Sequence, residues 1–322
     1  MAEATRVAFG RALLRLGASE PRLVVLDADL ASSTQTRAFA ERYPERFLQV
    51  GIAEGNMVGV AAGLALAGKI PVAASFACFL TGRFEQIRVS VAYNRANVKL
   101  VGTHAGIGIG EDGYSQMATE DVALMRSLPN VAIINPADGR EAEAAVEYMI
   151  AHDGPVYLRL TRQKVADVSP ADSGFRFGRG VVLREGSDLV IVASGAVVGH
   201  ALEAADLLAR DGIQAAVLNI HTIKPIDAAL LLEWASRVGR LLTVEDHSIH
   251  GGLGSAVCEV VCEGGPAVVH RHGVRDFGES GSAEALYRKH QLDGAGIAAK
   301  GREILEGGGP RASTLRRVAG RH

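Results

Sequence analysis

Short apolar runs alternate with longer segments that carry one apolar face throughout the first half of the chain. The runs predict strands, and apolar positions three or four residues apart predict helices. Strands are expected at residues 23–26, 47–50, 70–75, 98–101, 131–134 and 156–160, and helices at 4–17, 54–67, 81–95 and 139–151. This alternation is typical of a mostly parallel sheet with helices on both faces.

The second half repeats the alternation after a polar, glycine-containing stretch. We interpret residues 166–187 as a linker between a first domain at 1–165 and a second α/β domain at 188–305. Residues 306–322 hold three consecutive glycines and four arginines, and we expect a disordered basic tail there, with a functional arm as the alternative. In the second domain, strands are expected at 188–193, 214–219, 240–245 and 267–270, and helices at 197–210, 227–236 and 251–261.

Composition narrows the class of protein. Of 322 residues, 48% are hydrophobic, 38 are glycine and 5% are aromatic, which suits an α/β fold. The formal net charge of −2 offers no basic surface for nucleic acid or an anionic membrane. No apolar run has the length of a membrane span, no signal peptide is visible, and the three cysteines show neither metal-site nor disulfide spacing. We expect a soluble, cytoplasmic protein.

Glu54 is the most informative single residue. It lies among small and apolar residues, including Met57 and Val58, at the predicted start of a helix, so we expect it to be largely buried. Burying a charged acid is costly without a partner and favours the protonated form. Such an acid suits proton exchange near neutral pH. The alternative is a structural acid that accepts the backbone N–H groups of the helix N-terminus.

A glycine-rich segment at residues 101–116 follows one of the predicted strands. Glycine lets the backbone approach a ligand closely, and the segment would present His104, Asp112, Ser115 and Gln116. Glycines can also serve turns alone, which is the alternative. The segment has no lysine, so it is not a phosphate loop of the G-x-x-x-x-G-K-[ST] type.

Three other strand ends carry candidate chemistry. The acids and hydroxyl groups of residues 27–34 either face a ligand or only cap a helix. Phe76 and Phe79 either pack in the core or stack on a heterocycle. Arg159 and Arg162 either form salt bridges on an edge strand or contact an anion, for which guanidinium groups are suited.

In this order and spacing, these segments resemble the C-terminal half of transketolase, and most closely the small subunit of two-chain transketolases. The resemblance extends from about residue 4 to about residue 301. It implies a pyrimidine-binding domain followed by a transketolase C-terminal domain. The family binds thiamine diphosphate between two domains. One holds the aminopyrimidine, and the other holds the diphosphate and a divalent metal. This chain resembles the part of the family that contains the aminopyrimidine-binding domain.

The resemblance also implies a role for each candidate residue. Glu54 corresponds to the family's glutamate that hydrogen-bonds the aminopyrimidine, and this hydrogen bond promotes removal of the thiazolium C2 proton. Phe79, with Phe76 beside it, corresponds to the family's stacking phenylalanine. Asp29 corresponds to an aspartate near the thiazolium. The expected catalytic residues are Glu54 and His104. The expected substrate contacts are Arg6, Ser33 and Arg162 at a phosphate, and His104, Asp112 and Gln116 elsewhere.

Two positions depart from the family pattern. The family usually reads G-E-D-G-P-[ST]-H-Q, whereas residues 110–117 read G-E-D-G-Y-S-Q-M, so Gln116 stands in place of a substrate-contacting histidine. An amide forms hydrogen bonds but is no general acid or base near pH 7. Gly82 stands where single-chain transketolases often have a tyrosine near the cofactor.

The family's G-D-G motif with a later asparagine, which holds metal and diphosphate, is absent from the sequence. The resemblance therefore implies a separate subunit that holds Mg²⁺ or Ca²⁺ and shares the thiamine diphosphate. No metal ligand is expected in this chain, and the implied assembly is an α2β2 heterotetramer.

The function hypothesis is transfer of a two-carbon ketol unit from a ketose phosphate to an aldose-type acceptor. A specialised enzyme that passes the unit to a non-sugar acceptor, such as a carrier-protein thiol, would fit Gln116. The β subunit of a 2-oxoacid dehydrogenase shares the architecture, but Arg6 and the G-I-G-E-D-G loop favour transketolase. A non-catalytic scaffold subunit is the remaining alternative, and the presence of Glu54 and Phe79 argues against it.

Overall fold

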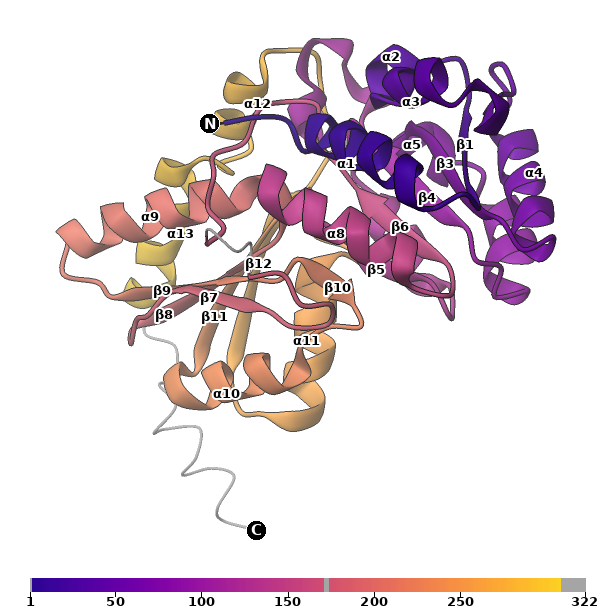
Figure 1. The fold of residues 1–322 in the computed structure, drawn as a ribbon. Helices are drawn as coiled ribbons and strands as arrows, with labels where there is room; N and C mark the ends of the chain where they lie inside the picture. The colour runs from indigo at the N-terminus through magenta and orange to yellow at the C-terminus, as the bar shows by residue number, and fades with distance from the viewer. Residues whose placement is uncertain (1, 171–173, 308–322) are drawn as a thin grey trace.

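The computed structural model describes residues 2–170 and 174–307 and contains two α/β domains (Figure 1). The first is built on a seven-stranded sheet with the order β10-β5-β6-β4-β3-β1-β2. Strands β1 to β6 run parallel to one another. They are β1 (Leu23–Asp27), β2 (Phe47–Gln49), β3 (Ile70–Phe76), β4 (Lys99–Thr103), β5 (Ala132–Ile134) and β6 (Val156–Arg159).

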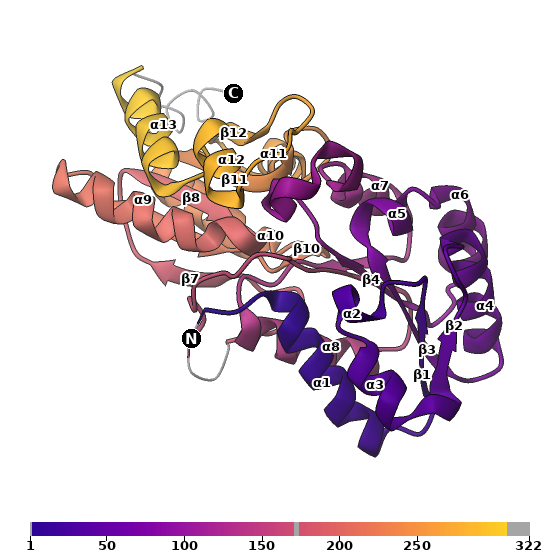
Figure 2. The ribbon, with the colours of Figure 1, turned by 90° about the horizontal axis from the view of Figure 1, so that it is seen from above.

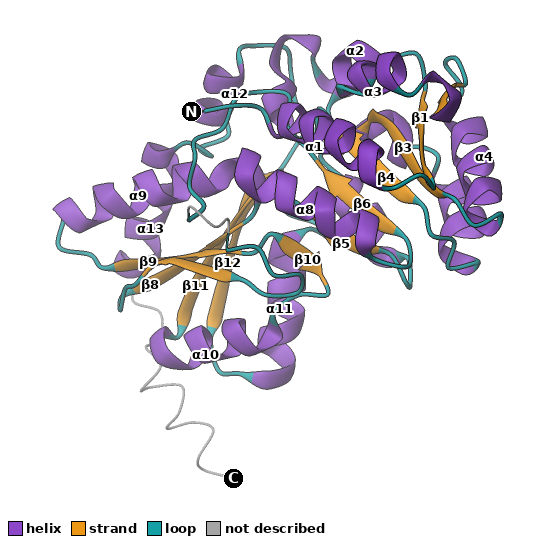
Figure 3. Cartoon of the chain, viewed as in Figure 1, coloured by secondary structure: helices purple, strands orange, loops and turns teal. Residues whose placement is uncertain are grey.

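Helices cover both faces of this sheet (Figure 3). Phe9 and Leu13 of α1 pack with Met149 of α8 against one face, and Met57 and Val58 of α4 pack against the other. The helices are α1 (Thr5–Ser19), α2 (Ala31–Thr34), α3 (Arg37–Arg42), α4 (Glu54–Leu66), α5 (Ala77–Thr81), α6 (Phe84–Gln86), α7 (Asp121–Ser127) and α8 (Gly139–Ala151).

The second domain has a five-stranded sheet with the order β12-β11-β8-β9-β7. Its strands are β7 (Val181–Arg184), β8 (Leu189–Ala193), β9 (Ala215–Asn219), β11 (Arg240–Ser248) and β12 (Val268–Val274). Its helices are α9 (Val198–Arg210), α10 (Ala228–Val238), α11 (Leu253–Gly264), α12 (Ala283–Lys289) and α13 (Gly294–Glu306). Helices α9 and α13 pack into one core, and α10 and α11 into another.

The two domains share a sheet and a core, and they lie side by side in Figure 2. Strand β10 (Thr222–Lys224) follows β9 in the chain but pairs antiparallel with β5, so the second domain contributes an edge strand to the first domain's sheet. Ile107, Ile109 and Met117 of the first domain pack with Leu286 and Tyr287 of the second in one continuous core. Docking therefore depends on both backbone pairing and apolar burial.

The predicted mostly parallel, two-domain α/β architecture is confirmed, with local differences. The range 81–95, expected as one helix, instead holds the last residue of α5, then α6 and a π-helix at Ile87–Tyr93, because α5 ends at Thr81 and Arg83 leaves helical geometry. The linker expected at 166–187 contains strand β7, an edge strand that is only partly buried and so lacks a strong apolar signal.

The predicted basic tail at 306–322 lies outside the described residues from position 308 onward. Within the part of the chain that the structure describes, no helix is long and apolar enough to cross a membrane. In the same residues, no group of three or more His, Cys, Asp or Glu side chains is placed to hold a metal ion.

Candidate functional site

The candidate residues gather at the carboxyl ends of the N-terminal domain's strands. Asp29 follows β1, Phe79 follows β3, His104 follows β4 and Arg162 follows β6. These four strands are consecutive in the sheet order β6-β4-β3-β1. Parallel strands end at one edge, where open α/β sheets bind ligands.

Glu54 is the first residue of α4 and is 7% exposed. The Ser75 hydroxyl donates a hydrogen bond to its Oε1 at 3.1 Å. Within residues 2–170 and 174–307, the carboxylate accepts no backbone N–H, so the structural alternative considered from the sequence lacks its partners. The burial expected for Glu54 is confirmed, and Oε2 has no hydrogen-bond partner among the described residues.

An aromatic stack lies beside Glu54's partner Ser75. The Phe76 and Phe79 rings are nearly parallel, with centroids 5.5 Å apart, and Phe76 stacks in turn on His104 at 3.7 Å. Phe76 is 6% exposed and packs against both of these rings. Phe79 is half-buried, so its outer face remains able to stack on a planar ring.

His104 is buried and lies in the left-handed backbone region, with φ +59°. One ring nitrogen, Nδ1, shares a hydrogen bond with the Thr103 hydroxyl at 2.9 Å. Burial lowers the pKa of His104 to about 3, with further lowering by the positive charges of Arg6 and Arg162. The imidazole is therefore neutral at pH 7 and suited to hydrogen bonding rather than to carrying a proton.

Arg6 and Arg162 form the electropositive side of the site. Arg6, on α1, donates to the backbone oxygen of Ser33, so Ser33 supplies its carbonyl group rather than its hydroxyl. Arg162 donates to the backbone oxygen of Ile109 at 3.0 Å and pairs with Glu111 at 3.3 Å. Burial and the charge of Arg162 lower the pKa of Arg6. Because two cations lie close together, the site favours an anion between them.

The remaining predicted residues, Asp29, Asp112 and Gln116, are exposed or only partly buried. Asp29 is exposed with φ +66°, and its backbone N–H donates to the Gln49 side chain at 2.7 Å. Asp112 is exposed. Gln116 lies next to α5, because its backbone oxygen accepts a hydrogen bond from the Cys78 thiol at 3.2 Å. Burial raises the pKa of Cys78 to about 12, so it stays a thiol.

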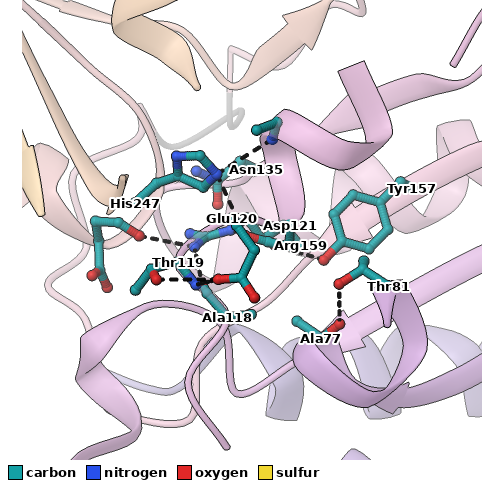
Figure 4. Close-up of polar contacts among 12 residues, drawn as sticks. Ala77, Thr81, Ala118, Thr119, Glu120, Asp121, Asn135, Tyr157, Arg159 and His247 are labelled. Atoms are coloured by element: carbon teal, nitrogen blue, oxygen red, sulfur yellow. Dashed lines mark hydrogen bonds and ion pairs between the residues drawn. The ribbon is translucent and has the colours of Figure 1, made fainter. Parts of the chain in front are cut away.

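Arg159 belongs to the domain boundary instead of the candidate site. Strand β6 lies inside the sheet, and Arg159 is 3% exposed. Its Nε pairs with Asp121 at 2.8 Å, while Tyr157 donates to the same carboxylate at 2.6 Å (Figure 4). Its Nη2 donates to the backbone oxygens of Ala118 and Asp246. The predicted salt bridge of Arg159 is confirmed, but on an interior strand instead of an edge strand, and the guanidinium is used inside the protein instead of contacting an anionic ligand.

The glycines of the loop after β4 fit the second domain. A Cβ at Gly106, where φ is +78°, would lie 2.1 Å from Asp246 Oδ2. A Cβ at Gly108 would lie 2.2 Å from the Gln163 amide nitrogen and 2.6 Å from the Tyr287 hydroxyl. The sequence suggested glycines for close approach to a ligand, but at these two positions the approaching atoms are the chain's own side chains. Sequence reasoning missed Asp246 and Tyr287.

Comparison with known proteins identifies relatives over nearly the whole chain. The model of the transketolase pyrimidine-binding domain matches residues 2–167, and that of the transketolase C-terminal domain matches 178–297. A putative transketolase C-terminal section from Methanocaldococcus jannaschii is 45% identical over 91% of this chain and 93% of its own length. A 6-deoxy-6-sulfo-D-fructose transketolase subunit, SqwH, from Clostridium sp. (strain MSTE9) is 42% identical over 91% and 92%.

Solved structures agree with these matches. A split-gene transketolase described as an inactive β4 tetramer is 47% identical, with a TM-score of 0.88 over 94% of this chain and 98% of that one. Human transketolase is 39% identical over 94% of this chain, which spans only 49% of the human protein.

Proposed function

Since the chain belongs to the transketolase family, we propose that it is the C-terminal subunit of a two-chain, thiamine-diphosphate-dependent transketolase. It would move a two-carbon ketol unit from a ketose phosphate to an aldose-type acceptor. The observation that carries this proposal is the placement of Glu54, a buried carboxylate with one oxygen held by Ser75 and the other without a protein partner in the described residues.

The residues at this edge fit the aminopyrimidine half of the cofactor. Bound thiamine diphosphate supplies a carbanion nucleophile that cleaves and forms carbon–carbon bonds beside a carbonyl group. Glu54 would hold a proton between Oε2 and a ring nitrogen, and its burial would strengthen that hydrogen bond. Phe79 would stack on the ring, while Phe76 supports it from behind. Asp29 would face the thiazolium side. The diphosphate and a divalent metal would be held by the partner subunit.

The electropositive side of the site would bind the substrate. Arg6 and Arg162 would contact its anionic end, with Ser33 fixing Arg6. His104, neutral at pH 7, would hydrogen-bond a hydroxyl group of the donor. Asp112 is exposed on the loop after β4 and would contact another hydroxyl group. The anion is proposed to be a phosphate. A sulfonate, as in the name of the Clostridium relative, is also an anion that two arginines could bind.

We propose an α2β2 assembly in which an apolar face beside Glu54 contacts another subunit. Ile52 is 84% exposed, Leu66 is 71% exposed and Tyr93 is 83% exposed. A Cβ added at Gly59 or Gly63 of α4 would meet no atom of the described residues within 4 Å. Large exposed apolar side chains beside an open helix face are typical of interaction surfaces.

A reconstitution assay tests the proposed function. The chain is co-expressed with its diphosphate-binding partner and supplied with thiamine diphosphate, Mg²⁺, xylulose 5-phosphate and ribose 5-phosphate. Transfer is expected only when both subunits are present, and Glu54→Ala should abolish donor cleavage. An assembled complex that cleaves no donor would favour a scaffold role. Donor cleavage that survives Glu54→Ala would contradict the role of Glu54.

Gln116 favours a second candidate, transfer of the two-carbon unit to a non-sugar acceptor such as a carrier-protein thiol. The Gln116 backbone lies against α5, which carries Phe79, so a side chain at this position is close to the proposed cofactor site. Donor cleavage without transfer to ribose 5-phosphate would support this candidate. Gln116→His should then restore sugar transfer, and unchanged acceptor use would show that position 116 is not the determinant.

A further inference from the structure

The loop between β4 and α7 is held by the C-terminal domain. Its base is closed by a backbone hydrogen bond from Gly106 to Ala118 at 2.9 Å. At that base, the Asp246 carboxylate accepts the Ile107 N–H at 2.9 Å through Oδ1 and the Tyr287 hydroxyl at 2.7 Å through Oδ2. Both hydrogen bonds are buried, so neither is replaced easily by water.

Further contacts continue this arrangement toward the tip of the loop. The Tyr287 hydroxyl also accepts the Gln163 amide at 2.6 Å. The Ser280 hydroxyl donates to the backbone oxygen of Glu111 at 2.5 Å, and the Tyr114 ring meets the Phe277 ring edge-on, with centroids 4.4 Å apart. The loop therefore rests on the second domain from its base to its tip.

We propose that Asp246 and Tyr287 are positioning residues: they set the geometry of the loop that begins at His104 and carries Asp112, and thereby the affinity for the donor substrate. This inference rests on the proposed function. Every residue assigned above to the cofactor or the substrate belongs to the N-terminal domain. The C-terminal domain acts through the backbone of residues 106–113, which lies between the two substrate contacts.

The neighbouring residue provides a matched control. Glu245 is also a buried carboxylate on β11, and it too accepts two hydrogen bonds, from the N–H groups of Leu253 at 2.6 Å and Gly254 at 2.9 Å. Those donors begin α11 of the same domain. Removing Glu245 should therefore destabilise the C-terminal domain without moving the loop, whereas removing Asp246 should do both.

Separate measurements of cofactor and donor affinity distinguish a positioning role of Asp246 from a general loss of stability. Glu54 and Phe79, on α4 and α5, have no contact with Asp246 among the described residues. Loss of the Asp246 contacts should thus raise the donor KM by about tenfold, as expected for a lost buried hydrogen bond to a charged group. The thiamine diphosphate concentration for half-maximal activity should stay within about twofold of wild type.

The experiment compares Asp246→Ala, Tyr287→Phe and Glu245→Ala with wild type. Amide hydrogen exchange of residues 104–117 is followed in the purified chain, and donor KM and cofactor half-saturation in the complex with its partner. We expect loop exchange to be faster by at least about tenfold and the donor KM to rise for Asp246→Ala, with a smaller change in the same direction for Tyr287→Phe. Glu245→Ala should lower the melting temperature but leave both values unchanged.

The hydrogen-exchange arm does not depend on activity, so it decides the positioning role even if the wild-type complex transfers nothing and the proposed function fails. Loop exchange that is unchanged in both Asp246→Ala and Tyr287→Phe would overturn the inference. So would a parallel loss of donor and cofactor affinity that Glu245→Ala reproduces. If Asp246→Ala does not fold, the inference is tested by Tyr287→Phe alone, because this variant removes one hydroxyl group and keeps the ring.

Discussion

In the C-terminal domain, the carboxyl ends of β8, β9 and β11 all contact the other domain. Ser194 accepts a hydrogen bond from Asn135 at 3.0 Å, Asn219 donates to Glu141 at 2.9 Å, and Asp246 accepts the Ile107 N–H. In the N-terminal domain, the corresponding edge carries Asp29, Phe79 and His104, the residues of the proposed site.

Under the proposed function, the same architectural feature serves different purposes at the two edges. The crevice outside the carboxyl ends of a parallel sheet is the usual ligand site of such folds. In the C-terminal domain this crevice is filled by the N-terminal domain, so its polar residues stabilise docking. The shared architecture alone therefore does not reveal where chemistry occurs; the partners of each strand-end residue do.

The largest effect is expected at the aromatic stack, where Phe76 belongs to the core shared by the two domains and Phe79 is proposed to bind the cofactor. Phe76→Ala should lower the free energy of unfolding by about 3–5 kcal/mol, because the ring is buried and stacks with Phe79 and with His104. Phe79→Ala should cost less stability but weaken thiamine diphosphate binding in the assembled enzyme by about tenfold. Urea denaturation and a cofactor titration measure the two effects. Equal effects of the two variants on both quantities would contradict the assignment of stacking to Phe79.

A pH-dependent effect is expected where Asn219 meets Glu141. Burial raises the pKa of Glu141 to about 8 from its ordinary value of 4.5, so the folded state retains a proton that the unfolded state releases. The stability that this difference in pKa gives the folded state is fully present below pH 4.5 and is lost as pH rises through about 8.

Glu141→Gln removes this titration. Between about pH 5 and about pH 9, the free energy of unfolding of wild type should fall relative to the variant by at most a few kcal/mol, an upper bound that follows from about 1.4 kcal/mol per pKa unit. Guanidinium denaturation at several pH values gives the comparison, and other titrating groups cancel in the difference. Parallel stability curves for the two proteins would show that Glu141 does not titrate in this range.

The smallest effect is expected on the open face of α4. A Cβ at Gly59 would meet nothing within 4 Å in the described part of the chain. Gly59→Ala should therefore stabilise the isolated chain by about 0.5–1 kcal/mol through helix propensity. The same variant should weaken assembly, measured by sedimentation, if this face contacts another subunit. Full assembly of Gly59→Ala would argue against the proposed interface.

Strongly buried strands were predictable from the sequence, whereas two of the edge strands, β7 and β10, were not. Strand β8 is fully buried and reads as a continuous apolar run, Leu189–Ala193. By contrast, β7 is partly exposed and β10 has three residues, so neither has a pattern that separates it from a loop. The β10 pairing with β5 is also a tertiary event, since it joins segments from different domains.

The same distinction applies to the candidate site. The placement of Glu54 at a helix start and of Phe79 after a strand followed from local pattern, and the family resemblance supplied their expected roles. The contact of Asp246 with Ile107 joins residues 139 positions apart. Nothing in the sequence of residues 244–247 indicates that one acid contacts its own domain and the next contacts the loop.

The central claim is that Glu54, a buried acid of the N-terminal domain, activates a cofactor, whereas Glu245, a buried acid of the C-terminal domain, holds a helix. The rate of hydrogen–deuterium exchange at C2 of bound thiamine diphosphate, followed by NMR in the complete complex, tests this directly. Glu54→Gln should slow the exchange by at least about a hundredfold, as expected for loss of a positioned proton-transfer group. Glu245→Gln should leave it within about threefold of wild type. Wild-type exchange in Glu54→Gln would contradict the account.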